Sequence, residues 1–483
     1  MREPATGHLG PRPAADDGGH PRRRAILAVV MLGTILGPID ASIVNVILPT
    51  ITRSFAASVA TAQWIPMAYL LTIGSLVLLF GRLGDIWGYR RIFLAGLAGF
   101  VAASALCALA PGIRWLIAFR VVQGLAAGTT MAVPLAILTR VFPAAQRGRV
   151  LGTYAVSISI GLAVGPSLGG FLAGAFGWRS AFLINVPIGL AALAFAARVL
   201  PDLKGQPGRL DLAGAATALG ALASFLLFVN RAQQVGLTAA TGALLAAAAA
   251  FAVGFLRVES RAPVPMLRLE LFRAPALTFG ALAALLNFMA QYVVVFVTPF
   301  LLQRTLAAGP GRVGLIMTAF PLSVLCVAPF AGALSDRIGT AGLAFAGTSV
   351  CAGGCALLAT VPASAGARDV AWRLVVFGVG TGVFQSPNNS AVMGSAPREH
   401  LGVVSSLLGT TRTVGMMLGV AAAGAVLYAF VPAAVLRHSV LAPADAAAFV
   451  AGARRAYAAG ALFAALAAFA CLVRARRPAV LAT

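Results

Sequence analysis

The chain has 483 residues, of which 60% are apolar and only 10% are charged, and its mean hydropathy is +0.93. Since a soluble domain carries about 25% charged residues, this composition excludes an ordinary soluble protein and predicts a multi-pass membrane protein. The net charge of +23 comes from arginines spread thinly between apolar runs, which argues against the clustered basic face of a nucleic-acid-binding protein. The five cysteines lie in apolar runs without a C-x-x-C pair, so neither a disulfide framework nor a metal site is expected.

The chain begins with a polar tail, residues 1–24, which we expect to be disordered. Apolar windows of about 20 residues follow, each long enough to cross a bilayer as a helix. The 14 windows lie at 25–49, 63–81, 92–110, 114–139, 150–173, 180–200, 211–230, 237–256, 276–302, 312–334, 341–361, 372–394, 402–430 and 450–473, and a second tail spans 475–483. The sequence thus predicts an all-α membrane protein with 14 transmembrane helices.

The distribution of basic residues orients these helices. If both termini are cytoplasmic, the segments on the cytoplasmic side hold 23 Arg or Lys and those on the outer side hold 11. This two-to-one bias follows the positive-inside rule, so we expect both tails on the inner side of the cell membrane.

The stretch GRLGDIWG at 81–88 recurs as GALSDRIG at 332–339, with Gly, Leu, Asp and Gly in register. Each copy follows the second helix of a six-helix block. We therefore expect two six-helix bundles, 25–200 and 276–474, separated by two inserted helices within 201–275. Parallel repeats of this kind are typical of transporters, which hold the substrate between the two halves near the middle of the membrane.

Asp40 is the only acid deep inside a predicted span. Because a carboxylate costs about 2.5–3.5 kcal/mol at the centre of a helix in a membrane, such residues usually serve a function. A buried carboxyl that is neutral in one conformation and ionised in another can carry a proton. The alternatives are a packing role or an ion pair with Arg120, one of two arginines inside the spans. Arg120 itself could instead extend toward a lipid headgroup.

The stretch GLAVGPSLGG at 161–170 predicts a close helix–helix contact. A spacing of four places Gly161, Gly165 and Gly169 on one helix face, where a neighbouring backbone can approach. Pro166 adds a point at which the helix can bend. Plain small-residue packing is the alternative. Further along, LDLAG at 210–214 predicts that Asp211 caps the next helix.

These motifs, in this order, resemble the major facilitator superfamily, and specifically its fourteen-helix drug:proton antiporters of the EmrB/QacA type. The resemblance rests on DASIVNVILP from Asp40, GRLGDIWGYRR from Gly81, RVVQGLAAG from Arg120 and the glycine-proline stretch, and it extends from about residue 25 to 474. It implies export rather than import. It also implies proton coupling by Asp40 and Arg120, a conformational switch formed by Gly81, Asp85, Gly88, Arg90, Arg91 and Asp336, and an antiporter helix containing Gly161, Gly165, Pro166, Gly169 and Gly170.

Polar residues within the other spans are candidates for the substrate cavity, with hydrogen bonding between helices as the alternative. They are Asn45, Gln123, Asn287, Gln291, Tyr292, Gln385, Asn388 and Arg412. Arg412 could bind an anionic group of the substrate, pair with Asp40 or bind a backbone carbonyl.

The function that we predict is proton-coupled efflux of hydrophobic drugs, antibiotics or metabolites by alternating access. We expect transport to be driven by the proton gradient, without a cofactor. We expect a small hydrophobic substrate, which could be a cation. The protein should lie in the lipid bilayer as a monomer. The alternatives are a transporter for one metabolite or an uncoupled importer. An enzyme is disfavoured because the four histidines, His8, His20, His400 and His438, all lie in tails or loops.

Overall fold

The computed structural model describes residues 21–203, 205, 210–262, 269–395, 401–437 and 443–476. Within these residues every regular element is a helix, which confirms the predicted all-α class. The two predicted tails lie almost entirely outside the described residues. The first helix begins at Arg23, so the last two residues assigned to the tail belong to it.

The first part of the chain forms an N-terminal bundle. Its helices are α1 (Arg23–Ser54), α2 (Val59–Ala62), α3 (Trp64–Trp87), α4 (Tyr89–Ala108), α5 (Ile113–Ala132), α6 (Pro134–Val141), α7 (Ala144–Phe176), α8 (Ser180–Leu183) and α9 (Asn185–Val199). Two predicted spans are interrupted, 114–139 between α5 and α6 and 180–200 between α8 and α9. Pro134 explains the break between α5 and α6, because proline lacks the amide hydrogen that a continuing helix needs and favours a helix start.

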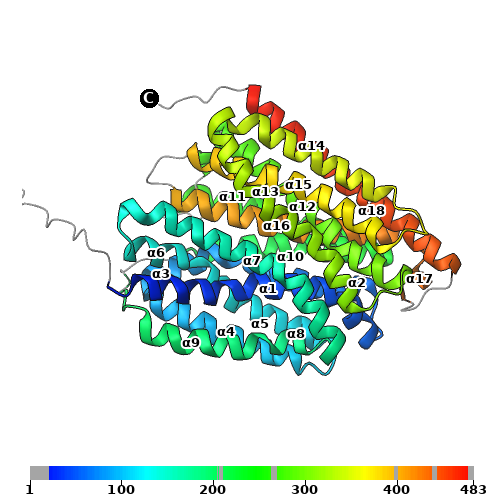
Figure 1. The fold of residues 1–483 in the computed structure, drawn as a ribbon, viewed down its shortest axis with the longest axis horizontal. Coiled ribbons are helices and arrows are strands. Elements are labelled where there is room, and N and C mark those ends of the chain that lie inside the picture. The colour runs from blue at the N-terminus through cyan, green and yellow to red at the C-terminus, as the bar shows by residue number, and fades with distance from the viewer. Residues whose placement is uncertain are drawn as a thin grey trace, which may run out of the picture.

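The last part of the chain forms a C-terminal bundle beside the first (Figure 1). It contains η1 (Leu269–Arg273), α12 (Pro275–Thr305), α13 (Pro310–Ile338), α14 (Thr340–Ala359), α15 (Ala367–Gly394), α16 (Leu401–Phe430), α17 (Ala433–Arg437) and α18 (Pro443–Arg476). The helix α1 begins and α18 ends at one end, which we call the terminal face, and α2 and α17 lie at the opposite end, the far face (Figure 1).

The two copies of the repeated motif adopt the same local structure. Gly88 joins α3 to α4 with φ +93°, and Gly339 joins α13 to α14 with φ +88°. This left-handed conformation is readily adopted only by glycine, which explains why both copies end in that residue. The sequence repeat therefore corresponds to a structural repeat of helix, sharp turn and helix.

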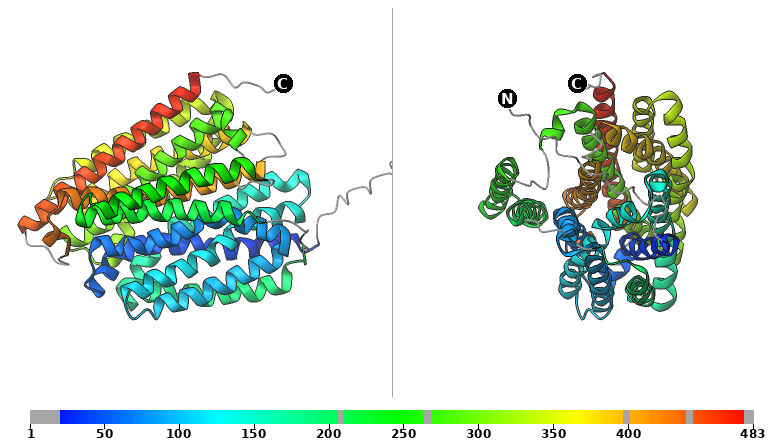
Figure 2. Two further views of the ribbon diagram at one scale, coloured as in Figure 1. Left: turned by 180° about the vertical axis from the view of Figure 1, so that it is seen from behind. Right: turned by 90° about the vertical axis from the view of Figure 1, so that its left-hand side faces the viewer.

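Between the bundles, α10 (Leu212–Val235) and α11 (Ala239–Arg261) form a helical hairpin. The helix α10 packs against α3 and α16, whereas α11 packs on α10. Figure 2 shows this pair at the side of the bundles. Asp211 accepts a hydrogen bond from the backbone N–H of Gly214 at 2.7 Å, which confirms the predicted helix cap. Only 17% of the apolar window of α10 and 11% of that of α11 are buried, as expected for a surface that contacts lipid.

Within the described residues, 13 helical segments are long and apolar enough to cross a membrane. The remaining predicted window, 372–394, falls on α15, a helix of 28 residues that packs between α13 and α14. Charged and amide residues, including Arg373 and Asn388, lower its average hydropathy. Its position inside the bundle explains how it tolerates them, since its polar groups face protein.

Candidate functional site

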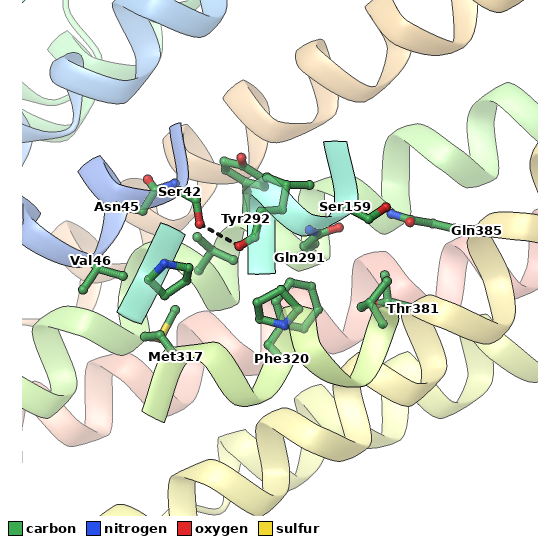
Figure 3. A pocket seen from close by; sticks show the side chains of 15 residues that line it. Ser42, Asn45, Val46, Ser159, Gln291, Tyr292, Met317, Phe320, Thr381 and Gln385 are labelled. Carbon is green, nitrogen blue, oxygen red and sulfur yellow. Dashed lines mark hydrogen bonds between the residues drawn. The ribbon is translucent and has the colours of Figure 1, made fainter. Parts of the chain in front are cut away.

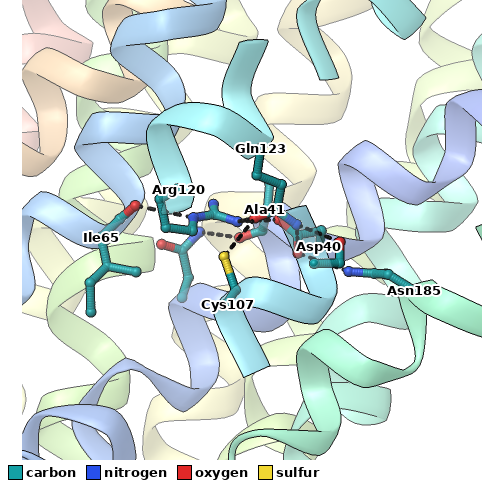
Figure 4. Close-up of polar contacts among 9 residues, drawn as sticks. Asp40, Ala41, Ile65, Cys107, Arg120, Gln123 and Asn185 are labelled. Atoms are coloured by element: carbon teal, nitrogen blue, oxygen red, sulfur yellow. Dashed lines mark hydrogen bonds and ion pairs between the residues drawn. The ribbon is translucent and has the colours of Figure 1, made fainter. Parts of the chain in front are cut away.

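Asp40 forms an ion pair with Arg120 in the interior of the N-terminal bundle (Figure 4). Nη1 of Arg120 donates to Oδ2 of Asp40 at 2.5 Å, and the two residues are only 1% and 0% exposed. The pair joins α1 to α5. The structure thus adopts one of the alternatives left open by the sequence, because both charges are paired with each other and neither reaches lipid or solvent.

Two amides complete the surroundings of the carboxylate. Nε2 of Gln123 and Nδ2 of Asn185 each donate to Oδ1 of Asp40 at 3.0 Å. The Gln123 carbonyl accepts from Arg120 at 2.6 Å, while its amide also reaches the Ser104 hydroxyl at 2.9 Å. Helices α1, α5 and α9 therefore meet at one carboxylate, whose oxygens are satisfied by charge and hydrogen bonds together, and α4 supports Gln123 through Ser104. We call Asp40, Arg120, Gln123 and Asn185 the Asp40 cluster.

Arg120 is held from two more sides. Its Nε donates to the Ile65 carbonyl at 3.2 Å, at the beginning of α3. Its guanidinium lies 4.0 Å from the ring centroid of Tyr69, a cation–π contact that is favourable away from water. Tyr69 is itself buried, so its ring on α3 helps to enclose the ion pair.

Asn185 is a member of the cluster that sequence reasoning missed. The signal was present, because Asn185 lies inside an apolar window and a polar side chain at membrane depth needs a partner. Asn185 is the first residue of α9, directly after the break between α8 and α9, and its side chain reaches Asp40.

A cavity lined by residues of both bundles lies between them (Figure 3). Four of the eight predicted cavity residues line it, namely Asn45, Gln291, Tyr292 and Gln385. Its other walls mix hydroxyl, aromatic and aliphatic groups, contributed by Ser42, Val46, Ser159, Leu162, Pro166, Val295, Met317, Phe320, Pro321, Val324 and Thr381. Both bundles therefore contribute to one mostly apolar chamber with several neutral polar groups, as in many small-molecule sites.

The other four predicted cavity residues lie elsewhere or at its margin. Gln123 belongs to the Asp40 cluster. Asn388 donates to the Gly280 carbonyl and accepts from Arg474 at 2.7 Å, so it joins α15 to α12 and α18. Asn287 is fully buried on α12, one turn before the cavity residue Gln291. Arg412, in the middle of α16, is not among the residues that line the cavity.

The three glycines of the predicted helix face turn toward α1. A Cβ on Gly161 would lie 2.9 Å from Cγ1 of Ile35, and one on Gly165 would lie 2.5 Å from Cβ of Ser42. At Gly169 the nearest atom would be Cγ2 of Ile43, at 2.8 Å. The spacing in the sequence thus corresponds to a backbone contact between α7 and α1, the helix that carries Asp40.

The bundles are joined from the middle of the molecule to the far face. Within the described chain, the hydrogen bonds between the halves link Thr50 to Gln303 at 3.2 Å, Gln303 to Val46, Ala60 to Tyr428 at 3.2 Å, and Ser167 to Thr318 at 2.6 Å. Gly170 and Pro166 of α7 also pack on Gly314 of α13. The halves are therefore closed against each other at the far face.

The residues predicted as a conformational switch lie at the terminal face and contact their own bundle. Asp85 accepts hydrogen bonds from Tyr89 at 2.5 Å and from Arg82 at 3.3 Å. Arg90 donates to the Ala197 carbonyl at 2.6 Å. Gly88 packs on the Leu203 carbonyl, whereas Gly81 has open space around it and Arg91 and Asp336 are exposed. In this conformation, the motif ties the turn between α3 and α4 to the segment after α9.

Comparison with known proteins agrees with this architecture. Residues 30–420 match the model of the Major Facilitator Superfamily. The chain is 33% identical over 425 residues to the uncharacterized transporter YebQ of Escherichia coli, covering 87% of this chain and 92% of the relative. It is 31% identical to the riboflavin transporter RibZ of Clostridioides difficile, with 82% and 86% covered, and 30% identical to a tetracenomycin C resistance and export protein of Streptomyces glaucescens, with 83% and 75% covered.

Among solved structures, a bacterial homolog of the human lysosomal transporter Spinster, in an inward-facing and occupied conformation, superimposes with a TM-score of 0.69 at 17% identity. The match covers 95% of this chain and 98% of that one, so the two share a fold. The chain belongs to the major facilitator superfamily. It is therefore a multi-pass membrane transporter, as the repeat and the motifs predicted, and not an enzyme.

Proposed function

We propose that this protein is a proton-coupled exporter of small hydrophobic compounds and belongs to the fourteen-helix antiporters of its superfamily. The observation that carries the proposal is the position of Asp40 on α1. One face of this helix presents Asp40 to the buried cluster, and another presents Ser42, Asn45 and Val46 to the cavity. A change in the protonation of Asp40 on one face of α1 can therefore affect substrate binding at the other face.

Coupling follows from the contacts of Arg120. While Asp40 is ionised, the ion pair holds α1 against α5. Protonation removes the negative charge, and Arg120 is then left without a counter-charge in a dry environment, which is unfavourable by several kcal/mol. A movement of α1 then becomes favourable if it gives Arg120 new hydrogen-bonding or charged partners. Pro38 and Pro49 lie within α1 and are points at which this helix can bend.

The direction of transport rests on the positive-inside rule and on the relatives. With the terminal face in the cytoplasm, the closed far face blocks access to the cavity from outside, as expected of the state in which an exporter loads its substrate from inside. The relative from Streptomyces glaucescens is named as an export protein. The glycine-proline stretch of α7 forms both the contact with α1 and the closure of the far face.

Transport in inside-out membrane vesicles tests the proposal. Imposing a proton gradient should drive substrate uptake into the vesicles, a protonophore should stop it, and Asp40→Asn should abolish the gradient-driven part. Uptake that is unaffected by the protonophore, or an Asp40→Asn variant that still responds to it, would contradict proton coupling. Candidate substrates come from a susceptibility panel in a host that lacks its own efflux pumps.

A transporter dedicated to one metabolite is the second candidate, because a relative at 31% identity is named as a riboflavin transporter. The same vesicles distinguish the two functions. Accumulation of riboflavin alone, in right-side-out rather than inside-out vesicles, would favour uptake of a single compound.

A further inference from the structure

The carboxylate of Asp40 is surrounded by hydrogen-bond donors. Nη1 of Arg120 donates to its Oδ2, and the amide nitrogens of Gln123 and Asn185 each donate to its Oδ1 at 3.0 Å. Donors suit an ionised carboxylate, which only accepts hydrogen bonds. A protonated carboxyl also carries an O–H group, and an O–H group buried away from water needs an acceptor. The cluster must therefore supply an acceptor if Asp40 takes up a proton in this conformation.

The amide of Gln123 is fixed in its orientation. Its Oε1 accepts from Arg120 at 2.6 Å, and its Nε2 donates to the Ser104 hydroxyl at 2.9 Å as well as to Asp40. Turning this oxygen toward Asp40 would break the bond to Arg120 and place an N–H group against the guanidinium, where two donors would face each other. Since buried polar groups without partners are unfavourable, Gln123 remains a donor to the carboxylate.

Asn185 is not restricted in this way. Its Nδ2 donates to Asp40, and its Oδ1 has no hydrogen-bond partner among the described residues, although the residue is fully buried. Figure 4 shows it reaching Asp40 from the side away from Arg120. The two ends of a planar amide are nearly equal in size, so a half-turn exchanges the nitrogen for the oxygen in the same space. This half-turn breaks no hydrogen bond other than the one to Asp40.

The backbone around Asn185 is held by close packing. Asn185 begins α9, which packs on α1 and α4. A Cβ on Gly189, one turn later, would collide with Cγ2 of Val101 on α4 and would lie 3.6 Å from Cδ1 of Leu36 on α1. Helix packing therefore fixes the separation between α9 and the carboxylate, and rotation of the amide is the small movement that remains to this residue.

The titratable side chains around the carboxylate are Arg120, Tyr69 on α3 and Cys107 on α4. Sγ of Cys107 makes a hydrogen bond within the cluster but not to Asp40. The Tyr69 hydroxyl is buried without a hydrogen-bond partner among the described residues, and it would lie 3.5 Å from a Cβ on Gly37, one turn before Asp40. Tyr69 is therefore the alternative acceptor, whereas Asn185 combines an unused acceptor with an existing contact to the carboxylate.

We propose that Asn185 is a positioning residue for the proton on Asp40, because its amide donates to the ionised carboxylate and, after a half-turn, accepts from the protonated carboxyl. The proton then lies on Oδ1, and Oδ2 remains an acceptor for Arg120. The neutral carboxyl thus keeps its place in the N-terminal bundle, while Arg120 loses its counter-charge and is the group that must find new partners. The inference rests on the proposed function, since it takes Asp40 as the proton site.

Infrared difference spectroscopy tests the proposal, because the C=O stretching band of a protonated carboxyl responds to its hydrogen bonds. The purified full-length protein in nanodiscs is compared at high and low pH, and the carboxyl band that is lost in Asp40→Asn belongs to Asp40. Asn185→Leu removes both the donor and the acceptor, so it should move this band to higher wavenumber. An unmoved band in an Asn185→Leu variant that is folded, as judged by its melting curve, would overturn the proposal.

A second measurement uses the wild-type side chain and does not depend on how Asn185→Leu folds. Protein made with asparagine that is isotope-labelled at the side-chain carbonyl should show an amide band in the same pH difference spectrum, because the Asn185 oxygen gains a hydrogen bond when Asp40 is protonated. Asp40→Asn should remove this amide band. Asn287→Leu should leave it in place and is the matched control, since Asn287 is another fully buried asparagine and has no hydrogen bond to the cluster. The absence of an amide band that depends on Asp40 would contradict the half-turn.

Tyr69→Phe tests the alternative acceptor. It keeps the ring against Arg120 but removes the hydroxyl, so the carboxyl band should stay at the same wavenumber. If Tyr69→Phe moves the band and Asn185→Leu does not, the tyrosine is the acceptor and the role assigned to Asn185 is wrong.

The same spectra separate this inference from proton coupling. If no carboxyl band depends on Asp40, this residue takes up no proton, and the proposed coupling fails together with the role of Asn185. If the band depends on Asp40 but is unaffected by Asn185→Leu, the coupling stands and the role of Asn185 fails alone.

Discussion

Gly170 of α7 and Gly314 of α13 touch backbone to backbone across the two bundles. A Cβ on Gly170 would lie 2.9 Å from the Cα of Gly314, and a Cβ on Gly314 would also meet the Pro166 carbonyl. No larger side chain fits at either position while the far face is closed. An exporter that alternates must separate these helices when it opens outward, so this contact belongs to one conformation only.

Gly314→Leu should therefore shift the protein away from the closed far face. Overpacking of this kind costs about 1–3 kcal/mol, which changes a balanced two-state equilibrium by about five- to a hundredfold. Spin labels at Arg53 and Ala434, both exposed at the far face, report the change as a longer distance in a cysteine-free background. Gly342→Leu is the control, because a Cβ at Gly342 meets nothing within 4 Å. An unchanged distance distribution would show that the contact does not set the equilibrium.

Gly165→Leu tests the contact within the N-terminal bundle. A side chain there would collide with Ser42, so we expect α1 to be displaced, with loss of transport and a lower melting temperature. Gly165→Ala should have a smaller effect in the same direction. Gly152→Leu, elsewhere on α7, introduces the same side chain into open space. Normal turnover in the Gly165→Leu variant would show that the glycine face is not a close interface.

The sequence was sufficient for the features that depend on local pattern. The positions of the helices follow from the length of the apolar runs, and the repeated turn follows from the glycines at positions 88 and 339. The glycine face follows from a spacing of four. Each of these three features depends on residues that are close together in the chain, so one sequence without related sequences is enough to predict it.

What the sequence could not provide is which polar side chains meet. Asp40 and Arg120 are 80 residues apart, and Asn185 is 145 residues from Asp40, so only the tertiary fold brings them together. Eight candidates for the cavity were predicted from their polarity within apolar spans, but helix rotation decides which of them face the cavity, and four do. Gln123 faces the ion pair for that reason, and Asn388 faces Arg474.

The inserted hairpin makes a further prediction about the far face. Gln233 of α10 accepts a hydrogen bond from Gln63 at 3.2 Å and donates to the Ala421 carbonyl at 3.3 Å, so it binds both bundles at once. Asn230 adds a bond to the Ala60 carbonyl at 3.0 Å. Because these bonds require the closed far face, α10 should stabilise that state.

Gln233→Leu should lengthen the distance between the far-face spin labels, with an effect of about 1–3 kcal/mol because a buried amide of Gln63 loses its partner. Gln234→Leu is the matched control, since Gln234 bonds only to Asn230 within α10 among the described residues. If both variants behave like the wild type, the hairpin packs against the bundles without influencing their opening.

The ion pair at Asp40 predicts separate effects on stability and on coupling. Asp40→Asn leaves Arg120 buried without a counter-charge, and breaking a buried pair in this way costs about 3–5 kcal/mol. The double variant Asp40→Asn and Arg120→Gln removes both charges and should regain a large part of that stability, measured by thermal unfolding in detergent. Proton-driven transport should remain absent in both, because neither variant has a group that exchanges a proton at this position. A double variant that regains transport along with stability would show that Asp40 holds the bundle together and carries no proton.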